Sequence, residues 1–311
     1  MDCLEHSWPE CDVEFSRRII VSRLYDALRK VEEQSREVPN NPAPAKTLVA
    51  PLRSPEPLPA IPTLPARIGS ESRIIVSSDP RSPGSERFRL IRMALRNAAG
   101  GRLPKILLIT SPLPQDGKST VALNLATSLT EGGKNRVLLL EADLHRPSVL
   151  SALGLDWMPG LSEVLQGGET TSAVIRRIEP LGFYLLSAGR TSDNPSELFQ
   201  GEKFSSLLQE LKAGFDCVLI DCPPAFPLAD VVALKSHADG VLLVARAGAT
   251  PREAVRETIQ LFKPGQVLGL ILNAETEINQ MYAKYYYQKD SSGSSGISVA
   301  KAEHSWTQKE R

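Results

Sequence analysis

One stretch near the middle of the chain constrains its fold more than any other. It runs Thr110-Ser111-Pro112-Leu113-Pro114-Gln115-Asp116-Gly117-Lys118-Ser119-Thr120, between an apolar run at 105–109 and a helix-forming run that begins at Val121. A strand that turns sharply into a helix points unpaired backbone N–H groups and the positive end of the helix dipole at one place, which favours an anion. The stretch therefore predicts a phosphate-binding loop.

Three residues of this loop suit the phosphates of a nucleotide. Gly117 lets the backbone approach closely, Lys118 can reach the β- and γ-phosphates, and Ser119 offers a hydroxyl to Mg²⁺. The general pattern has a glycine five residues before Gly117, where this chain has Pro112. From the loop alone, an ordinary strand-to-helix turn with an exposed lysine stays open as the alternative.

Charge and hydropathy exclude several classes of protein. The chain has 36 basic and 36 acidic side chains, a balance that does not favour nucleic acid as a partner. No apolar run reaches the roughly 18 residues of a membrane span, and the first 30 residues are too charged for a signal peptide. We therefore expect a cytoplasmic protein. Its cysteines lack the paired spacing of a metal site and are expected to be reduced thiols: Cys3, Cys11, Cys217 and Cys222.

The chain is expected to divide into four parts. Residues 1–36 contain an amphipathic helical segment, which packs either on the folded domain or on a partner. Residues 37–72 form a disordered linker, because nine prolines fall between positions 39 and 65. Residues 73–280 form a P-loop domain, and residues 281–311 hold a tyrosine cluster and a mobile tail.

Short apolar runs alternate with helical segments after the phosphate loop. This alternation predicts an α/β fold in which a mostly parallel sheet is covered by helices on both faces. Strands are expected at residues 105–110, 136–141, 183–187, 216–221, 240–245 and 267–273. The helix signals are Gly132-Gly133 as a stop, Asn194-Pro195 as a start, and Thr250-Pro251-Arg252-Glu253 as a capping box.

Acidic residues follow two of these strands. Glu141 and Asp143 come after one apolar run, and Asp221 comes after another. Ligands of such sheets bind at the carboxyl ends of the strands, where carboxylates can hold Mg²⁺ directly or through water. Each carboxylate alone can be an ordinary strand-ending polar residue. Together with the Gly-Lys-Ser-Thr run they predict a Mg·nucleotide site.

A further helix is expected at residues 84–98. On one flank, Glu86 is followed at intervals of three by Arg89 and Arg92. This flank is either a solvated helix face or a contact with an acidic surface of a neighbouring subunit. The apolar stripe of the helix is formed by Phe88, Ile91 and Leu95.

These motifs resemble those of the bacterial tyrosine kinases of the CpsD/CapB type, also found as the cytoplasmic domain of Wzc-like proteins. The resemblance covers about residues 75–287 and rests on a Walker A motif at 111–120, a second acidic motif (Walker A′) at 138–143 and a Walker B motif at 218–224. Shorter phrases at 159–162, 194–198 and 269–273 support it. Residues 22–28 resemble the openings of exopolysaccharide-associated members.

The resemblance implies an α/β P-loop NTPase fold of the MinD/ParA-like kind, and a tyrosine autokinase that uses ATP and Mg²⁺ and regulates capsule or exopolysaccharide synthesis. The nucleotide contacts that it implies are Gly117, Lys118, Ser119, Thr120 and Asn273. The implied Mg²⁺ ligands are Ser119, Asp143 and Asp221. The implied catalytic set is Lys118, Glu141, Asp143 and Asp221, with Glu141 taking the proton of the incoming tyrosine.

The resemblance also implies substrates and partners. The implied phosphoacceptors are Tyr282, Tyr285, Tyr286 and Tyr287, which are four of the six tyrosines in the chain. Residues Glu86, Arg89 and Arg92 match the family's oligomerisation motif and imply a ring in which one subunit's tail enters its neighbour's active site. A transmembrane polysaccharide co-polymerase would activate the kinase and hold it at the membrane, and a tyrosine phosphatase would reverse the reaction.

Two departures from the family pattern keep other functions open. The second acidic motif usually begins with Asp and carries Arg four residues later, but this chain has Glu141 and His145. A misplacement of about 1 Å can cost about 100-fold in rate, so a kinase-dead regulatory adaptor is one alternative. The other is an ATPase switch of the MinD/ParA type, although Leu113 stands where its signature lysine would lie.

Overall fold

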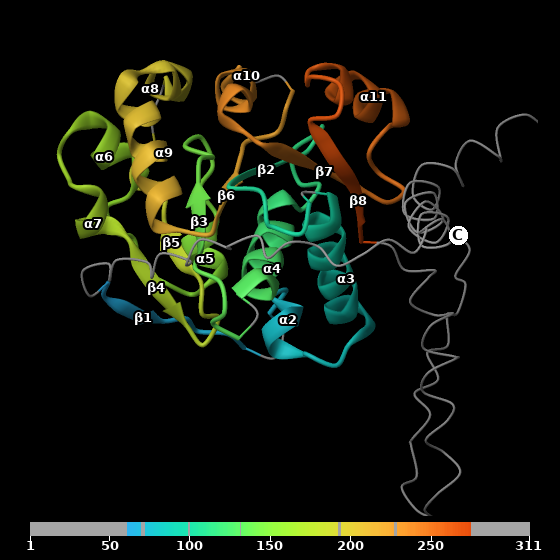
Figure 1. The fold of residues 1–311 in the computed structure, drawn as a ribbon, viewed down its shortest axis with the longest axis horizontal. Coiled ribbons are helices and arrows are strands. Elements are labelled where there is room, and N and C mark those ends of the chain that lie inside the picture. The colour runs from blue at the N-terminus through green and yellow to red at the C-terminus, as the bar shows by residue number, and fades with distance from the viewer. Residues whose placement is uncertain are drawn as a thin grey trace, which may run out of the picture. The chain divides into compact units, whose positions relative to one another are not determined.

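The chain forms an α/β domain with a largely parallel sheet (Figure 1). The structure is a computed structural model that describes residues 61–69, 72–98, 100–130, 132–191, 194–226 and 229–274. Within these ranges the eight strands follow the order β1-β4-β5-β3-β6-β2-β7-β8. Strands β4 and β5 pair antiparallel, and the other neighbours pair in parallel. The predicted fold class is confirmed.

All six strands expected from the sequence are present, with ends that move by one residue at most. The central strands β2, β3 and β6 are buried along their whole length, which explains their unbroken apolar runs. The strands are β1 (Thr63–Pro65), β2 (Ile106–Thr110), β3 (Val137–Glu141), β4 (Arg176–Glu179), β5 (Tyr184–Leu186), β6 (Cys217–Asp221), β7 (Gly240–Arg246) and β8 (Val267–Asn273).

Helices cover both faces of the sheet, and each face has its own apolar core. Alternate residues of a strand enter different cores: Leu108 packs with α6, α8, α9 and α10, whereas Leu107 packs with α3, α4 and α5. The helices are α2 (Ile75–Ser78), α3 (Pro83–Ala98), α4 (Lys118–Thr130), α5 (Val149–Ala152), α6 (Leu161–Gln166), α7 (Thr171–Val174), α8 (Pro195–Gln200), α9 (Glu202–Gly214), α10 (Asp230–Leu234) and α11 (Arg252–Gln260). A 3₁₀ turn spans Lys235–His237.

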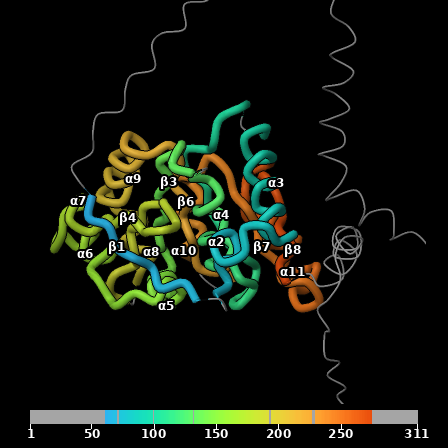
Figure 2. The backbone as a smooth tube through the Cα atoms, turned by 90° about the horizontal axis from the view of Figure 1, so that it is seen from below, coloured from blue at the N-terminus to red at the C-terminus, as the bar shows by residue number. Residues whose placement is uncertain are grey.

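Strand β1 lies in the segment for which the sequence predicts a linker. Residues Thr63–Pro65 pair in parallel with β4, and the backbone N–H of Ala66 donates to the carbonyl of Glu179 (2.8 Å). Both views show this strand beside β4 at one edge of the sheet, where proline is tolerated (Figure 2). The linker prediction is therefore wrong for these residues, and the folded part begins earlier than residue 73.

The helix predicted at 84–98 is α3. Its apolar stripe faces the core through the buried Leu95, and the two other apolar residues pack half-buried beside it. On the flank, Arg89 pairs with Glu86 (2.6 Å) on an exposed surface. Arg92 donates from its guanidinium to the carbonyl of Ser128 at the end of α4 (3.0 Å). The motif thus joins two helices of one subunit as well as presenting charge outward.

Several predictions concern segments outside the described residues, namely the N-terminal helical segment and the cluster Tyr282, Tyr285, Tyr286 and Tyr287. Among the described residues, no helix has the length and apolar character needed to cross a bilayer.

Candidate active site

The phosphate loop connects two elements of the fold as the sequence predicts. Strand β2 ends at Thr110, and α4 begins at Lys118. The hydroxyl of Thr110 donates to the carbonyl of Pro223, which ties the start of the loop to the segment after β6 (2.8 Å). Because β2, β3 and β6 run parallel and adjacent, their carboxyl ends bring the loop and the acidic residues to one edge of the sheet.

Gly117 and Asn273 are in close contact at the end of the loop. Gly117 has a φ of +94°, and a Cβ at this position would collide with the side-chain nitrogen of Asn273. That nitrogen donates to the carbonyl of Asp116 (2.9 Å). A glycine is therefore required here by both backbone conformation and space.

Lys118 forms an ion pair with Asp143. The Lys118 Nζ lies 2.9 Å from Asp143 Oδ2, and both side chains are largely buried. Burial lowers the pKa of Lys118, but the carboxylates of Asp221 and Asp143 outweigh burial and raise the pKa above its ordinary value. The other oxygen of Asp143 accepts the backbone N–H of Arg146 (3.0 Å). The lysine is thus held charged at the mouth of the loop.

Asp221 is a buried carboxylate whose two oxygens lack hydrogen-bond partners. Burial raises its pKa to about 7, although the charge of Lys118 and the nearby hydroxyl of Ser119 act to lower it. A carboxylate left in this state at a strand end suits a divalent cation with oxygen ligands. Among the described residues, no group of three or more His, Cys, Asp or Glu side chains can hold a metal alone. Mg²⁺ would therefore need phosphate and water oxygens as further ligands, as is usual at nucleotide sites.

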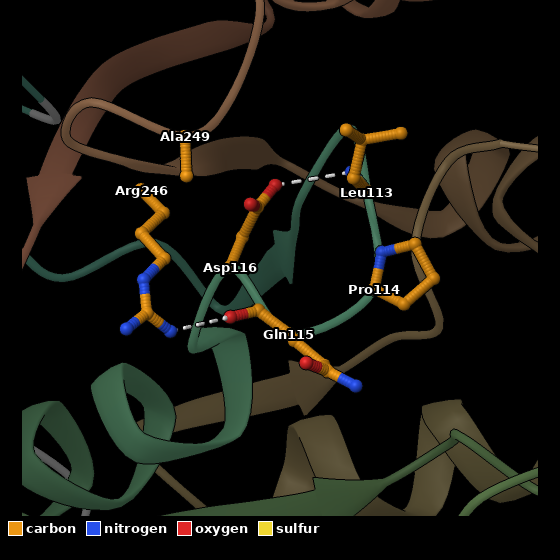
Figure 3. A pocket seen from close by; sticks show the side chains of 6 residues that line it. All are labelled: Leu113, Pro114, Gln115, Asp116, Arg246 and Ala249. Atoms are coloured by element: carbon orange, nitrogen blue, oxygen red, sulfur yellow. Dashed lines mark hydrogen bonds between the residues drawn. The ribbon is translucent and has the colours of Figure 1, made fainter. Parts of the chain in front are cut away.

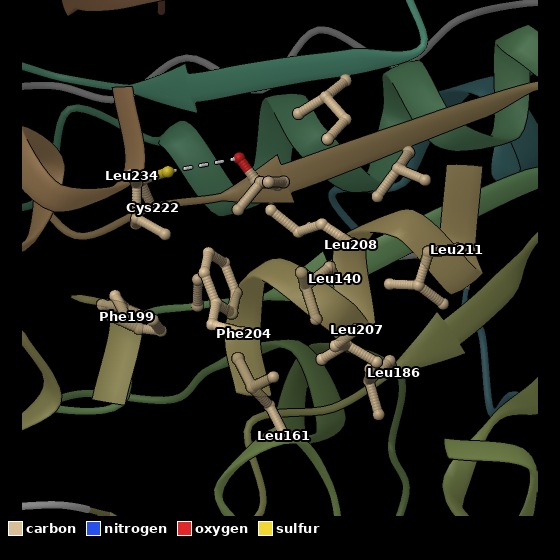
Figure 4. Close-up of a cluster of buried hydrophobic side chains, with 14 of the residues drawn as sticks. Leu140, Leu161, Leu186, Phe199, Phe204, Leu207, Leu208, Leu211, Cys222 and Leu234 are labelled. Atoms are coloured by element: carbon tan, nitrogen blue, oxygen red, sulfur yellow. Dashed lines mark hydrogen bonds between the residues drawn. The ribbon is translucent and has the colours of Figure 1, made fainter. Parts of the chain in front are cut away.

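The residue after Asp221 anchors the strand end in the core. Figure 4 shows Cys222 among buried side chains near Leu234, with its Sγ donating to the carbonyl of Ile220 (3.5 Å). Cys222 and Cys217 are free, buried thiols, as the sequence predicts.

Glu141 is a buried carboxylate that accepts three backbone hydrogen bonds. One carboxylate oxygen accepts the backbone N–H groups of Ser148 (2.6 Å) and Val149 (2.8 Å), and the other accepts that of Ala188 (3.2 Å). The side chain is buried, and burial raises its pKa despite these bonds. Both oxygens therefore accept hydrogen bonds from the start of α5 and from the segment after β5.

His145 pairs with a residue that sequence reasoning missed. Its Nε2 lies 2.8 Å from Oδ2 of Asp230, a buried residue at the start of α10. The pair ties the second acidic motif to the helix that follows the Walker B segment. No local pattern marks Asp230, because its partner lies 85 positions away in the chain.

A shallow hollow of about 380 Å³ lies on the outer side of the phosphate loop (Figure 3). It is lined by Leu113, Pro114, Gln115, Asp116, Arg246 and Ala249. The Arg246 guanidinium donates to the carbonyl of Gln115 (3.4 Å). The hydroxyl of Thr250 donates to a carboxylate oxygen of Asp116 (2.6 Å). Sequence reasoning assigned Thr250 to a helix cap, and it gave no role to Asp116.

Gln115 adopts a left-handed backbone conformation, with a φ of +66°, and its side chain is exposed. A left-handed conformation costs a non-glycine residue roughly 1–2 kcal/mol. Glycine removes this strain, but it loses more chain entropy on folding, which offsets part of the gain. We expect Gln115→Gly to stabilise the protein by about 0.5–1 kcal/mol in urea unfolding. Gln115→Ala keeps the strain and serves as the control. Equal stability of the two variants would show that the backbone is not strained.

The sheet order, the loop and the acidic strand ends define a P-loop nucleotide-binding protein of the α/β class. An AAA domain family model matches residues 115–266. Tyrosine-protein kinase YwqD of Bacillus subtilis is 33% identical over 223 residues, which cover 71% of this chain and 93% of YwqD. The chain belongs to the family of bacterial tyrosine-protein kinases, as its motifs indicated.

Other relatives extend beyond this chain. It spans about a quarter of tyrosine-protein kinase ptk of Acinetobacter johnsonii, which is 35% identical over 190 residues covering 60% of this chain and 26% of ptk. The succinoglycan biosynthesis transport protein ExoP of Rhizobium meliloti is 31% identical over 70% of this chain and 30% of its own length. The kinase domain of Escherichia coli tyrosine kinase ETK has a similar fold, with a TM-score of 0.63, 26% identity, and coverage of 76% of this chain and 88% of that one.

Proposed function

We propose that this protein is an ATP-dependent tyrosine autokinase that phosphorylates the tyrosine cluster in its own C-terminal segment. The observation that carries the proposal is the buried carboxylate of Asp221, which makes no well-formed hydrogen bond and lies near the charge of Lys118 and the hydroxyl of Ser119. This charge arrangement fits a divalent cation together with the phosphates of a nucleotide. Membership of the tyrosine-kinase family supports the acceptor chemistry.

Phosphoryl transfer requires positioning and charge neutralisation more than covalent chemistry. Lys118 would leave Asp143 to bind the β- and γ-phosphates. The loop amides would hold the same phosphates, and Thr120 would contact the α-phosphate. Ser119 and Asp221 would hold Mg²⁺, with Asp143 as a further ligand through water. Mg²⁺, when bound, neutralises charge on the transferred phosphoryl group.

The proton of the acceptor tyrosine needs no dedicated carboxylate in this proposal. Glu141 is occupied by three backbone N–H groups, so we assign it to holding the second acidic motif in place. Transfer through a loose transition state demands little assistance from a base, so the phenolic proton would pass to a phosphoryl oxygen or to solvent water. This assignment is therefore compatible with kinase activity.

The predicted acceptors give the test of the proposal. Incubation of the purified chain with Mg·ATP is expected to place phosphate on Tyr282, Tyr285, Tyr286 and Tyr287, as mapped by mass spectrometry. Changing all four to Phe should abolish the signal, whereas Tyr184, which lies in β5, serves as an unlabelled internal control. ATP hydrolysis without phosphotyrosine would favour an ATPase switch of the MinD/ParA type. Nucleotide binding without turnover would favour a regulatory adaptor.

The proposal also covers the oligomeric state of the kinase and its partners. We propose a homo-oligomeric ring in which Glu86, Arg89 and Arg92 contact the neighbouring subunit, so that each tail is phosphorylated in trans. We further propose that a transmembrane co-polymerase activates the protein, holds it at the membrane and couples it to capsule or exopolysaccharide synthesis, with a tyrosine phosphatase as antagonist. The relationship to ExoP supports the link to polysaccharide.

A further inference from the structure

Asp116 closes the phosphate loop from within. This carboxylate is only 4% exposed, and one of its oxygens accepts the backbone N–H of Leu113 across the loop (3.0 Å), as Figure 3 shows. The other oxygen accepts the hydroxyl of Thr250 (2.6 Å), which lies outside the loop between β7 and α11. A single side chain thus joins the loop to itself and to the neighbouring segment.

The hydroxyl of Thr250 is directed at Asp116 by its own surroundings. Its oxygen accepts the backbone N–H of Arg246 (2.7 Å), and the Thr250 N–H donates to the carbonyl of Arg246 (3.0 Å). A hydroxyl has one proton to donate, and in this arrangement the proton points to the carboxylate. The two bonds to the Arg246 backbone therefore fix Thr250 independently of its contact with the phosphate loop. The N-cap of α11 is Pro251 and not Thr250.

The loop depends on such external contacts because its backbone is unfavourable by itself. Gln115 and Gly117 both have positive φ angles, of +66° and +94°. The ends of two neighbouring strands hold the segment between them: Arg246 contacts the carbonyl of Gln115, and Asn273 donates to the carbonyl of Asp116. These contacts lie directly before Lys118, where the loop amides must converge on phosphate.

We propose that Thr250 is a positioning residue for nucleotide binding, which acts through Asp116 to hold the phosphate loop in its binding conformation. The inference rests on the proposed nucleotide site. A loop that is arranged before the ligand arrives loses less freedom on binding, so removal of the hydroxyl weakens binding without touching the ligand. Thr250→Val removes the hydroxyl at constant shape, and Thr250→Ser retains it.

Isothermal calorimetry with Mg·ADP tests the proposal on the full chain. Thr250→Val is expected to weaken binding about tenfold or more, and Thr250→Ser to stay within about threefold of wild type. Thr258→Val is the control, because it removes a hydroxyl that donates to the carbonyl of Ala254 inside α11, the helix that follows Thr250. Equal losses in the Thr250→Val and Thr258→Val variants would assign the effect to α11 in general and overturn the proposal.

A double-mutant cycle tests whether Thr250 affects nucleotide binding through Asp116 or independently of Asp116. If Thr250 acts through that carboxylate, Asp116→Ala with Thr250→Val should bind no more weakly than Asp116→Ala alone. Additive losses would overturn the proposal, as would wild-type affinity in Thr250→Val. Should the valine variant not fold, Thr250→Ala takes its place in the same cycle. Failure of wild type to bind Mg·ADP would refute the nucleotide site itself, which is a different outcome from normal binding by the variant.

Discussion

Replacing Asp221 with Asn is expected to stabilise the ligand-free protein while it removes the Mg²⁺-dependent part of nucleotide binding. The wild-type carboxylate is buried without a hydrogen-bond partner, so its negative charge destabilises the folded state. The amide has the same shape and no charge. We expect a gain of about 2 kcal/mol at pH 8, measured by urea unfolding. Asp216→Asn, directly before the same strand, is the control, since that carboxylate accepts the backbone N–H of Arg136 on an exposed surface.

The stabilisation by Asp221→Asn should depend on pH in a defined direction. Burial raises the pKa of the folded carboxyl from 3.8 to about 7, so the folded state binds the proton more tightly than the unfolded state. The stability linked to this proton is fully present below about pH 4 and is lost as the pH rises through about 7. The gap between variant and wild type should therefore widen over this interval. A gap that is constant with pH would contradict the assigned environment.

Calorimetry provides the functional half of the same experiment. For wild type, adding Mg²⁺ is expected to strengthen ADP binding about tenfold or more, because the cation neutralises Asp221 and the phosphates together. For Asp221→Asn the gain should fall to less than about threefold, because the amide brings no charge to the cation. A variant that gained as much from Mg²⁺ as wild type, or that was less stable without ligand, would remove Asp221 from the cation site.

The sequence predicts the apolar strands of this fold better than the strands that carry charge or proline, for a physical reason. Strands buried on both faces need unbroken apolar runs, and β2, β3 and β6 therefore stand out. Strand β4 has the sequence Arg-Arg-Ile-Glu, and β1 lies at an edge and ends in proline. Edge strands and strands with one solvated side tolerate charge and proline, so neither segment carries a strand pattern.

In the candidate site, the sequence predicts where the acidic residues lie but not which groups they bind. The rule that ligands bind at the carboxyl ends of parallel strands places Glu141 beside Asp221, and the two residues are indeed paired in register. The rule cannot give their hydrogen-bond partners. The backbone N–H of Ala188 that binds Glu141 lies 47 positions away, and the Asp116 carboxylate that binds Thr250 lies 134 positions away. Thr250 matches a capping pattern in the local sequence, but its hydroxyl donates to the distant Asp116 carboxylate, and the N-cap of α11 is Pro251.

Removal of the Glu141 carboxylate is expected to be the most destabilising single change considered for this site. Glu141→Ala leaves the backbone N–H groups of Ser148, Val149 and Ala188 without their acceptor. Each unsatisfied buried N–H costs about 1–3 kcal/mol, and removal of the buried charge offsets part of the total cost of the three groups. We therefore expect the free energy of unfolding, measured in urea, to fall by about 3 kcal/mol. Glu163→Ala is the matched control, because its carboxylate also accepts two backbone N–H groups but is less buried.

Two further variants decide between a structural and a proton-accepting role for Glu141. Restoring the family's residue with Glu141→Asp shortens the side chain by one methylene, so that it no longer reaches the start of α5, and stability should fall although a carboxylate is present. Glu141→Gln keeps one acceptor oxygen for Ser148 and Val149 and should retain tail phosphorylation in proportion to its folded fraction. If Glu141→Gln were fully folded and bound Mg·ADP normally, yet lost phosphorylation about 100-fold or more, Glu141 would be the proton acceptor after all.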